Sequence, residues 1–176
     1  MNGWILYKNP IEESWETQKL VEEFEKQDVK IRVVNPNDVD IFVDREDRKS
    51  IIVGGKPRWL PDFVIPRTGS GTTYFIKAII RHLERLGVTL INGSHAIDTV
   101  KDKLYTQQIL AESNLPVPKT LLLKHPINLD WVEKHLTFPV IIKTLSGSFG
   151  AGVFMAEDKK QLKQLVKMAE ITNEGY

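Results

Sequence analysis

The sequence predicts an α/β protein in two parts, a mainly parallel, doubly wound sheet followed by a smaller α+β unit. Short β-rich runs alternate with amphipathic helical segments through the first two-thirds of the chain, which is typical of parallel sheets. After the rigid segment Pro116-Val117-Pro118, two β-rich runs flank a glycine-rich turn. The 176 residues are 41% hydrophobic and 27% charged, so the chain can bury a core.

In the first part, apolar runs predict strands and apolar residues at helical spacing predict helices. The strands are expected at Gly3–Tyr7, Val29–Val34, Asp62–Pro66 and Val88–Ile91. The helices are expected at Glu13–Gln27 and Thr72–Leu86. Ser14 and Thr72 are the candidate N-caps, and Gly87 supplies a C-terminal stop.

A β-hairpin is predicted between the second and third of these strands. Its arms are Asp40–Val43 and Ser50–Val53, and the charged segment 44–49 between them is expected to be a solvated turn. The segment Gly54-Gly55-Lys56-Pro57 then ends the β pattern.

The second part is predicted to begin after residue 92, which divides the chain into domains 1–92 and 93–176. The stretch Asn92–Lys101 is expected to be the boundary region. Helices are predicted at Lys103–Glu112, at Asn128–His135 and after a capping Asp158, and strands at Thr120–Leu123, Phe138–Lys143 and Val153–Met155.

Composition excludes several classes of protein. Lys and Arg total 24 against 23 Asp and Glu, a net charge of +1, which argues against a general nucleic-acid binder. The chain has no Cys, so disulfides and thiolate chemistry are excluded and a cytoplasmic location is allowed. No apolar run is long enough to span a membrane. The four His lack metal-ligand spacing, and the four Trp are dispersed and expected to be at least partly buried. His82 is expected to be partly solvated.

The segment 141–153 holds the main candidate for chemistry. A strand ends at Lys143, a loop of small residues follows, and a second strand begins at Val153. Glycines let successive backbone N–H groups turn toward one anion, and a lysine adds charge for the same phosphate. The candidate phosphate-binding residues are Lys143, Ser146, Gly147, Ser148, Gly150 and Gly152. The alternative is an ordinary glycine-rich hairpin turn.

Two other cations are candidates for binding anions. Arg67 lies between a predicted strand and a helix N-terminus, where open α/β sheets place anion sites. The alternative is a simple turn in which Arg67 pairs with a structural carboxylate. Lys103 follows Asp102 at a helix start, where its charge opposes the helix dipole. It is either a phosphate ligand or an ordinary surface lysine.

In their order along the chain, these segments resemble the N-terminal portion of the RimK-like ATP-grasp ligases, a family of ATP-dependent glutamate ligases. The similarity covers essentially the whole chain. It is carried by Gly54 to Arg67 with Ile65-Pro66-Arg67 at its end, by Ile91-Asn92-Gly93-Ser94 with Ala96-Ile97, by Asp102-Lys103-Leu104, by Leu115-Pro116-Val117-Pro118, and by Pro139 to Lys143 continuing to Gly152-Val153.

The resemblance implies a pre-ATP-grasp domain followed by part of an ATP-grasp subdomain. It implies amide formation in which ATP, with Mg²⁺, phosphorylates a carboxylate that an amine then attacks. Lys103 and Lys143 would contact the ATP phosphates, and the loop Ser146–Gly152 would close over them. Arg67 would lie toward the substrate, which is an acidic group or amino acid. The acceptor is a peptide or a small molecule.

The chain departs from the family pattern at its C-terminal end. The adenine-contacting hinge and the Asp, Glu and Asn ligands for Mg²⁺ are expected beyond residue 176, so we expect a truncated ligase that is inactive alone. An incomplete second sheet would expose an apolar face, which favours a homo-oligomer. The alternatives are a non-catalytic nucleotide-sensing or partner-binding module and a substrate-binding domain without nucleotide.

Overall fold

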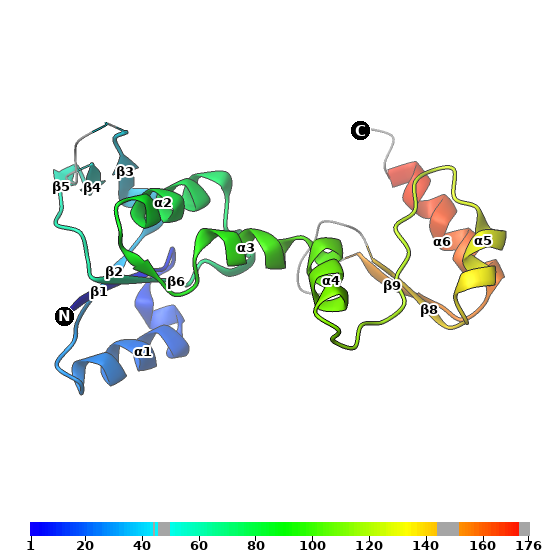
Figure 1. The fold of residues 1–176 in the computed structure, drawn as a ribbon, viewed down its shortest axis with the longest axis horizontal. Coiled ribbons are helices and arrows are strands. Elements are labelled where there is room, and N and C mark those ends of the chain that lie inside the picture. The colour runs from blue at the N-terminus through cyan, green and yellow to red at the C-terminus, as the bar shows by residue number, and fades with distance from the viewer. Residues whose placement is uncertain (44, 46–49, 144–151, 173–176) are drawn as a thin grey trace. The chain divides into compact units, whose positions relative to one another are not determined.

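The computed structural model describes residues 1–43, 45, 50–143 and 152–172, and it divides the chain into two compact units. The first unit is Met1–Asp98 and the second is Thr99–Tyr176 (Figure 1). The domain boundary expected after residue 92 stays a prediction. Each unit is described by itself.

The first unit is built on a parallel sheet, as the sequence predicts. Its strands are β1 (Asn2–Leu6), β2 (Lys30–Val34), β6 (Phe63–Pro66) and β7 (Thr89–Leu90). Their order is β2-β1-β6-β7, and all pairs are parallel. Leu6 lies opposite Val34 on one side and Pro66 on the other, so three strands end at the same edge of the sheet.

Helices α1 (Trp15–Glu25) and α2 (Tyr74–Arg85) cover the two faces of this sheet (Figure 1). On the α1 face, the Phe24 ring contacts the Phe63 ring, with centroids 5.3 Å apart. Gly3 makes room for this contact, because a Cβ on residue 3 would overlap the Phe63 ring.

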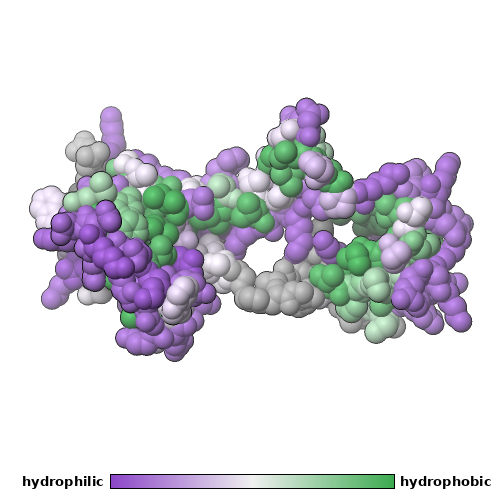
Figure 2. Space-filling view, turned by 90° about the horizontal axis from the view of Figure 1, so that it is seen from below, coloured by the Kyte–Doolittle hydropathy of each residue, from purple (hydrophilic) through white to green (hydrophobic). Residues whose placement is uncertain are grey.

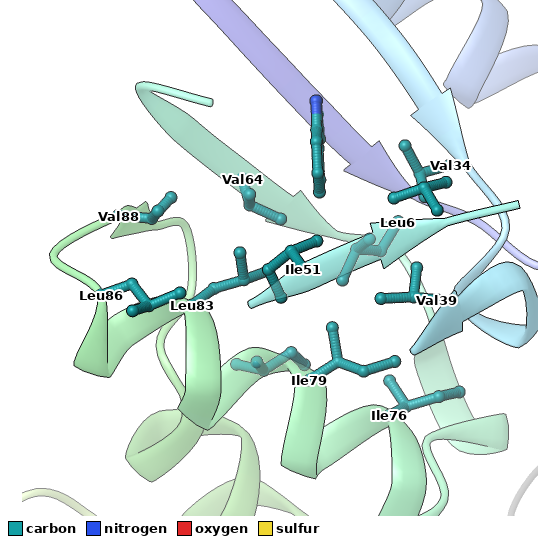
Figure 3. Packing of buried hydrophobic residues seen from close by; sticks show 13 residues of the cluster. Leu6, Val34, Val39, Ile51, Val64, Ile76, Ile79, Leu83, Leu86 and Val88 are labelled. Carbon is teal, nitrogen blue, oxygen red and sulfur yellow. The ribbon is translucent and has the colours of Figure 1, made fainter. Parts of the chain in front are cut away.

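On the α2 face, a second sheet joins the core. It contains β3 (Val39–Ile41), β4 (Ile51–Val53) and β5 (Lys56–Pro57), all antiparallel. The predicted hairpin is therefore confirmed, while most of its turn, 44 and 46–49, lies outside the described residues. Side chains from both sheets and α2 point toward one another in Figure 3, which labels Leu6, Val34, Val39, Ile51, Val64, Ile76, Ile79, Leu83, Leu86 and Val88.

The two main helices are capped by hydroxyl side chains. Ser14 Oγ accepts a hydrogen bond from Thr17 N at 3.1 Å, which confirms the predicted cap of α1. The cap of α2 is Thr73, whose Oγ1 accepts from Ile76 N at 3.4 Å. Thr72 does not take this role, because its buried hydroxyl donates to the Gly69 carbonyl.

His82 is buried, so the expectation of a partly solvated histidine is wrong. Only 5% of it is exposed, and its Nε2 lies 2.7 Å from Ser50 Oγ at the start of the hairpin's second arm. The small sheet covers this side of α2, which sequence periodicity cannot show. Burial, helped by the charge of Arg85, lowers the pKa of His82.

Two of the four tryptophans, Trp15 and Trp59, differ from the expected partial burial. Trp4 is in the core, whereas Trp15 is 69% exposed and Trp59 is 87% exposed. Trp131 is 43% exposed and stacks against His135, with ring centroids 4.4 Å apart. A large apolar side chain is thus by itself a weak guide to burial.

Helix α3 (Ser94–Lys101) occupies the stretch that the sequence analysis treats as a boundary region. Two polar contacts hold it to α2. Glu84 accepts hydrogen bonds from the backbone and the hydroxyl of Ser94, at 2.8 and 2.5 Å, and Lys77 pairs with Asp98 at 2.7 Å. The carboxylate that anchors α3 belongs to α2, so the sequence pattern around α3 does not predict this contact.

The second unit packs a two-stranded sheet against two helices. Its elements are α4 (Lys103–Glu112), α5 (Leu129–His135), β8 (Val140–Lys143), β9 (Val153–Ala156) and α6 (Lys159–Thr172). The predicted cap Asp158 is confirmed, because its side chain accepts from the backbone N–H of Gln161. Asn128, expected as the first residue of a helix, is instead the cap of α5, and its side chain accepts from the N–H of Trp131. The buried core is formed by Val132, Val140, Ala156 and Leu162.

The strand predicted at Thr120–Leu123 is wrong, because this described segment pairs with no strand. Leu121 and Leu123 instead pack on the core of the second unit. The apolar pattern of this segment is therefore explained by packing of an extended segment on the core, and not by pairing with another strand.

The remaining short 3-10 turns are η1 (Ile11–Glu13), η2 (Pro36–Asp38) and η3 (Gly69–Gly71).

Candidate functional site

Lys143 ends β8 on the outer face of the β8–β9 hairpin. It lies opposite Val153, and the next pair on the same face is Ile141 with Met155. The apolar side chains of Ile141, Val153 and Met155 are 55%, 42% and 54% exposed, respectively. The hairpin thus presents an apolar strip that ends in a cation. Hydrophobic residues are visible at the surface of the second unit in Figure 2.

This strip has the chemistry that a nucleotide requires. An apolar surface can take the face of a base, and a lysine at its end can take a phosphate. The sequence pattern identifies Lys143 as a candidate ligand but does not identify its apolar neighbours as part of the same surface. The alternation in residues 140–143 and 153–156 could have revealed them, had the hairpin register been known.

Most of the glycine-rich loop, with Ser146, Gly147, Ser148 and Gly150, lies outside the described residues, so contact of these four residues with phosphate stays a prediction. Gly152 is described, and its φ of +75° is a backbone conformation that glycine adopts without strain.

Lys103 is the first residue of α4, and its position is set by the preceding cap. Asp102 Oδ1 accepts hydrogen bonds from Leu104 N at 3.0 Å and Tyr105 N at 2.9 Å. The Asp102 carboxylate also offsets the positive end of the helix dipole, which Lys103 opposes. Lys103 and Lys143 both belong to the second unit but lie on different elements.

Arg67 belongs to the first unit, directly after β6. Its N–H donates to the Leu6 carbonyl at 2.9 Å, and its side chain is exposed. Behind it, the hydroxyls of Thr68 and Thr72 are buried 2.6 Å apart. Because Thr72 donates its proton to Gly69 O, the Thr68 hydroxyl is the donor of this pair. The loop after Arg67 is therefore fixed from within.

Lys8 is a functional candidate that the sequence analysis missed. It follows β1, the neighbour of β6, and its Nζ lies 2.6 Å from where a Cβ on Gly71 would be. The segments after adjacent parallel strands converge at one edge of the sheet, but the approach of Lys8 to Gly71 joins residues too far apart in the sequence for a local pattern to show it.

The described residues contain no group of three or more His, Asp or Glu side chains that could hold a metal ion. Over the same residues, no helix is long and apolar enough to cross a bilayer.

The fold of the chain is that of the ATP-grasp proteins. It is similar to a RimK domain ATP-grasp protein from Sphaerobacter thermophilus, with a TM-score of 0.71 and 16% identity, covering 99% of this chain and 61% of that one. It is also similar to the D-alanine–D-alanine ligase of Bacillus anthracis, with a TM-score of 0.59 and 18% identity, covering 96% and 53% of the two chains.

Within this class, the sequence identifies the family. Residues 1–97 match the RimK PreATP-grasp domain and residues 100–174 match the RimK-like ATP-grasp domain, so the chain belongs to the RimK family. It is 33% identical over 165 residues to a probable alpha-L-glutamate ligase of a Marinomonas species, covering 93% of this chain and 54% of the relative. A Shewanella amazonensis relative of the same description is 31% identical over 164 residues, with the same coverage. The chain thus spans about half the length of the curated relatives it matches.

Proposed function

We propose that this chain carries nucleotide- and substrate-binding residues of an ATP-dependent carboxylate–amine ligase that adds glutamate or another amino acid. The observation that carries the proposal is the strip of Ile141, Met155 and Val153 ending at Lys143, in a chain of the RimK family. ATP would supply the phosphoryl group that turns a carboxylate into an acyl phosphate, from which an amine then displaces phosphate.

The residues of the chain would hold and orient the reactants. The exposed apolar strip takes the nucleobase, and Lys143 takes the phosphates. Lys103 adds a second charge, and the loop at 146–150 together with Gly152 closes over the phosphates and excludes water. Cations fixed in advance favour the negative charge that develops during phosphoryl transfer.

Binding of ATP to the chain tests this proposal. Replacing Lys143 with Ala is expected to weaken ATP binding about tenfold, because a charge-assisted contact to phosphate is lost. Met155→Asp is expected to weaken it similarly, by placing a negative charge on the strip. The matched control is Lys134→Ala, which removes an exposed lysine from α5.

Isothermal titration with ATP provides the measurement. Equal affinity in Lys143→Ala and Lys134→Ala would refute the role of the hairpin. No ATP binding by the full-length wild-type protein would favour the substrate-binding domain without nucleotide. Binding of ATP without amide formation, by protein purified from its native source, would favour the nucleotide-sensing module.

The remaining parts of the proposal follow the family. We assign Mg²⁺ as the metal partner of ATP, an acidic or amino-acid substrate, a peptide or small-molecule acceptor, and a cytoplasmic location. The absence of Cys from the sequence suits a reducing compartment.

A further inference from the structure

The sequence contains two Asn-Gly pairs, and the structure holds them in different ways. In such a pair the asparagine side chain is readily attacked by the next backbone nitrogen, because glycine has no side chain to block the approach. The pairs are Asn2-Gly3 in β1 and Asn92-Gly93 between β7 and α3. They therefore allow a comparison of two identical dipeptides within one chain.

Asn2-Gly3 is fixed in the parallel sheet. Asn2 N donates to the Asp62 carboxylate at 2.7 Å, and the Asn2 carbonyl accepts from Asp62 N at 2.8 Å. Gly3 lies between its partners Ile31 in β2 and Phe63 in β6. The attack would require this peptide to leave a strand that is paired on both sides, so the rate is limited by local opening of the sheet.

Asn92-Gly93 lies in the bend that joins β7 to α3. Asn92 is exposed, and within the part of the chain that the structure describes no hydrogen bond involves its side chain or the Gly93 N–H. The flanking groups are held, because Ile91 N donates to Val64 O at 2.9 Å and Gly93 O accepts from Ile97 N at 3.1 Å. Attack at Asn92 therefore requires no opening of the sheet.

We propose that Asn92 is a site of spontaneous deamidation, with water as the co-reactant. The Gly93 nitrogen gives its proton to solvent and attacks Cγ of Asn92. The Cγ–Nδ2 bond breaks, and the nitrogen leaves as ammonia after taking a proton from solvent. Water then opens the resulting succinimide ring. Cleavage between the ring nitrogen and Cγ gives aspartate, and cleavage between the nitrogen and the main-chain carbonyl gives isoaspartate.

The product changes the contact that anchors α3. Glu84 accepts hydrogen bonds from the backbone and the hydroxyl of Ser94, and a Cβ on Gly93 would overlap the Glu84 carboxylate. Deamidation places a second carboxylate one residue away from Gly93, and like charges repel. Isoaspartate also lengthens the main chain by one carbon atom. Both changes displace the Ser94 donors from Glu84, so deamidation loosens the first turn of α3 from α2.

Incubation of the purified chain at mildly alkaline pH, followed by tryptic digestion and mass spectrometry, tests the site. Trypsin separates the two pairs, because Asn2 lies in the peptide Met1–Lys8 and Asn92 lies in Leu86–Lys101. The peptide with Asn92 is expected to gain about one dalton, at least about tenfold faster than the peptide with Asn2. In urea, which opens the sheet, both pairs are expected to react at similar rates.

Three variants complete the test. Asn92→Gln is expected to abolish the mass gain in its peptide, because the longer side chain must close a larger ring, and Asn2→Gln is the matched control that leaves this gain unchanged. Equal rates for the two pairs in the folded chain, or no gain at Asn92, would overturn the proposal. Asn92→Asp carries the charge of one product and is expected to raise amide exchange at Ser94 several-fold; unchanged exchange would overturn the proposed effect on α3.

Discussion

The buried pair of Ser50 and His82 makes a quantitative prediction about stability. Replacing Ser50 with Ala leaves Nε2 of His82 buried without its partner, 2.7 Å from where the hydroxyl was. Leaving one buried polar group unsatisfied costs about 2 kcal/mol of unfolding free energy. Ser50→Ala removes one oxygen atom, and the cavity this leaves is too small to cost much stability. The lost hydrogen bond therefore accounts for most of the expected change in unfolding free energy.

A double variant separates this effect from general damage. His82→Leu combined with Ser50→Ala removes both polar groups, and it is expected to recover most of the loss because no buried group is left unsatisfied. The control is Ser113→Ala, an exposed serine after α4, which is expected to change stability by less than about 0.5 kcal/mol.

Urea denaturation at pH 7.5, followed by the fluorescence of the buried Trp4, gives the free energies. The other three tryptophans are already exposed, so the signal mainly reports the first unit. The role of the Ser50–His82 hydrogen bond is refuted if the unfolding free energy of Ser50→Ala equals that of the wild type within the error of the control. It is also refuted if the double variant loses the sum of the two single losses.

The same pair predicts a pH dependence. Burial is the main cause that lowers the pKa of His82 from its usual 6.5, and the charge of Arg85 adds to it. As pH falls, the unfolded chain therefore takes up the proton first. The stability that comes from keeping His82 neutral is fully present above pH 6.5 and is lost as pH falls through the folded-state pKa. The loss is at most about 1.4 kcal/mol per pH unit. Denaturation between pH 7.5 and 5.5 is expected to show a smaller loss in His82→Leu, and equal losses would contradict this account.

Three further predictions concern single residues. Gly3→Ala is expected to destabilise the first unit by about 2 kcal/mol, because the Cβ would force the Phe63 ring to move; thermal melting measures it, and an unchanged midpoint would contradict the packing described. Asp102→Ala is expected to cost about 1 kcal/mol through loss of the α4 cap, and amide exchange in the first turn of α4 would rise; unaltered exchange would argue against the cap. Lys159→Met is expected to cost less than about 1 kcal/mol although it contacts two carboxylates, because exposed pairs contribute little; a larger loss in urea denaturation would contradict this.

Local patterns were sufficient for most of the fold. The parallel strands were found because their apolar runs are short and separated by helices, and α4 was found with its bounds because Asp102 precedes it. By contrast, α3 was missed because the contacts that hold it come from Glu84 and Lys77 on another helix. The two-residue strand β5 was missed because it contains Pro57, which disfavours strands.

Candidate site residues could be found where one segment contains the whole signal. Lys143 stands at the end of a strand before glycines, and Arg67 stands between a strand and a helix. Lys8 could not be ranked in this way, because its importance depends on Gly71, which is 63 residues away in sequence and 2.6 Å away at the Cβ position. Burial of His82 likewise depends on a hairpin that the helix pattern does not contain.

Strand β1 precedes both of its partners in the sequence and is also a central strand of the sheet, and this orders the folding of the first unit. Its partner β2 follows at Lys30–Val34, whereas β6 begins only at Phe63, and α2 and β7 complete the core from Tyr74 onward. Pairings of such long sequence separation form slowly. The side of β1 that pairs with β6 therefore waits for its partner until the growing chain supplies it. The β8–β9 hairpin has no such delay, because its strands are separated by a short loop and can pair as soon as both are made.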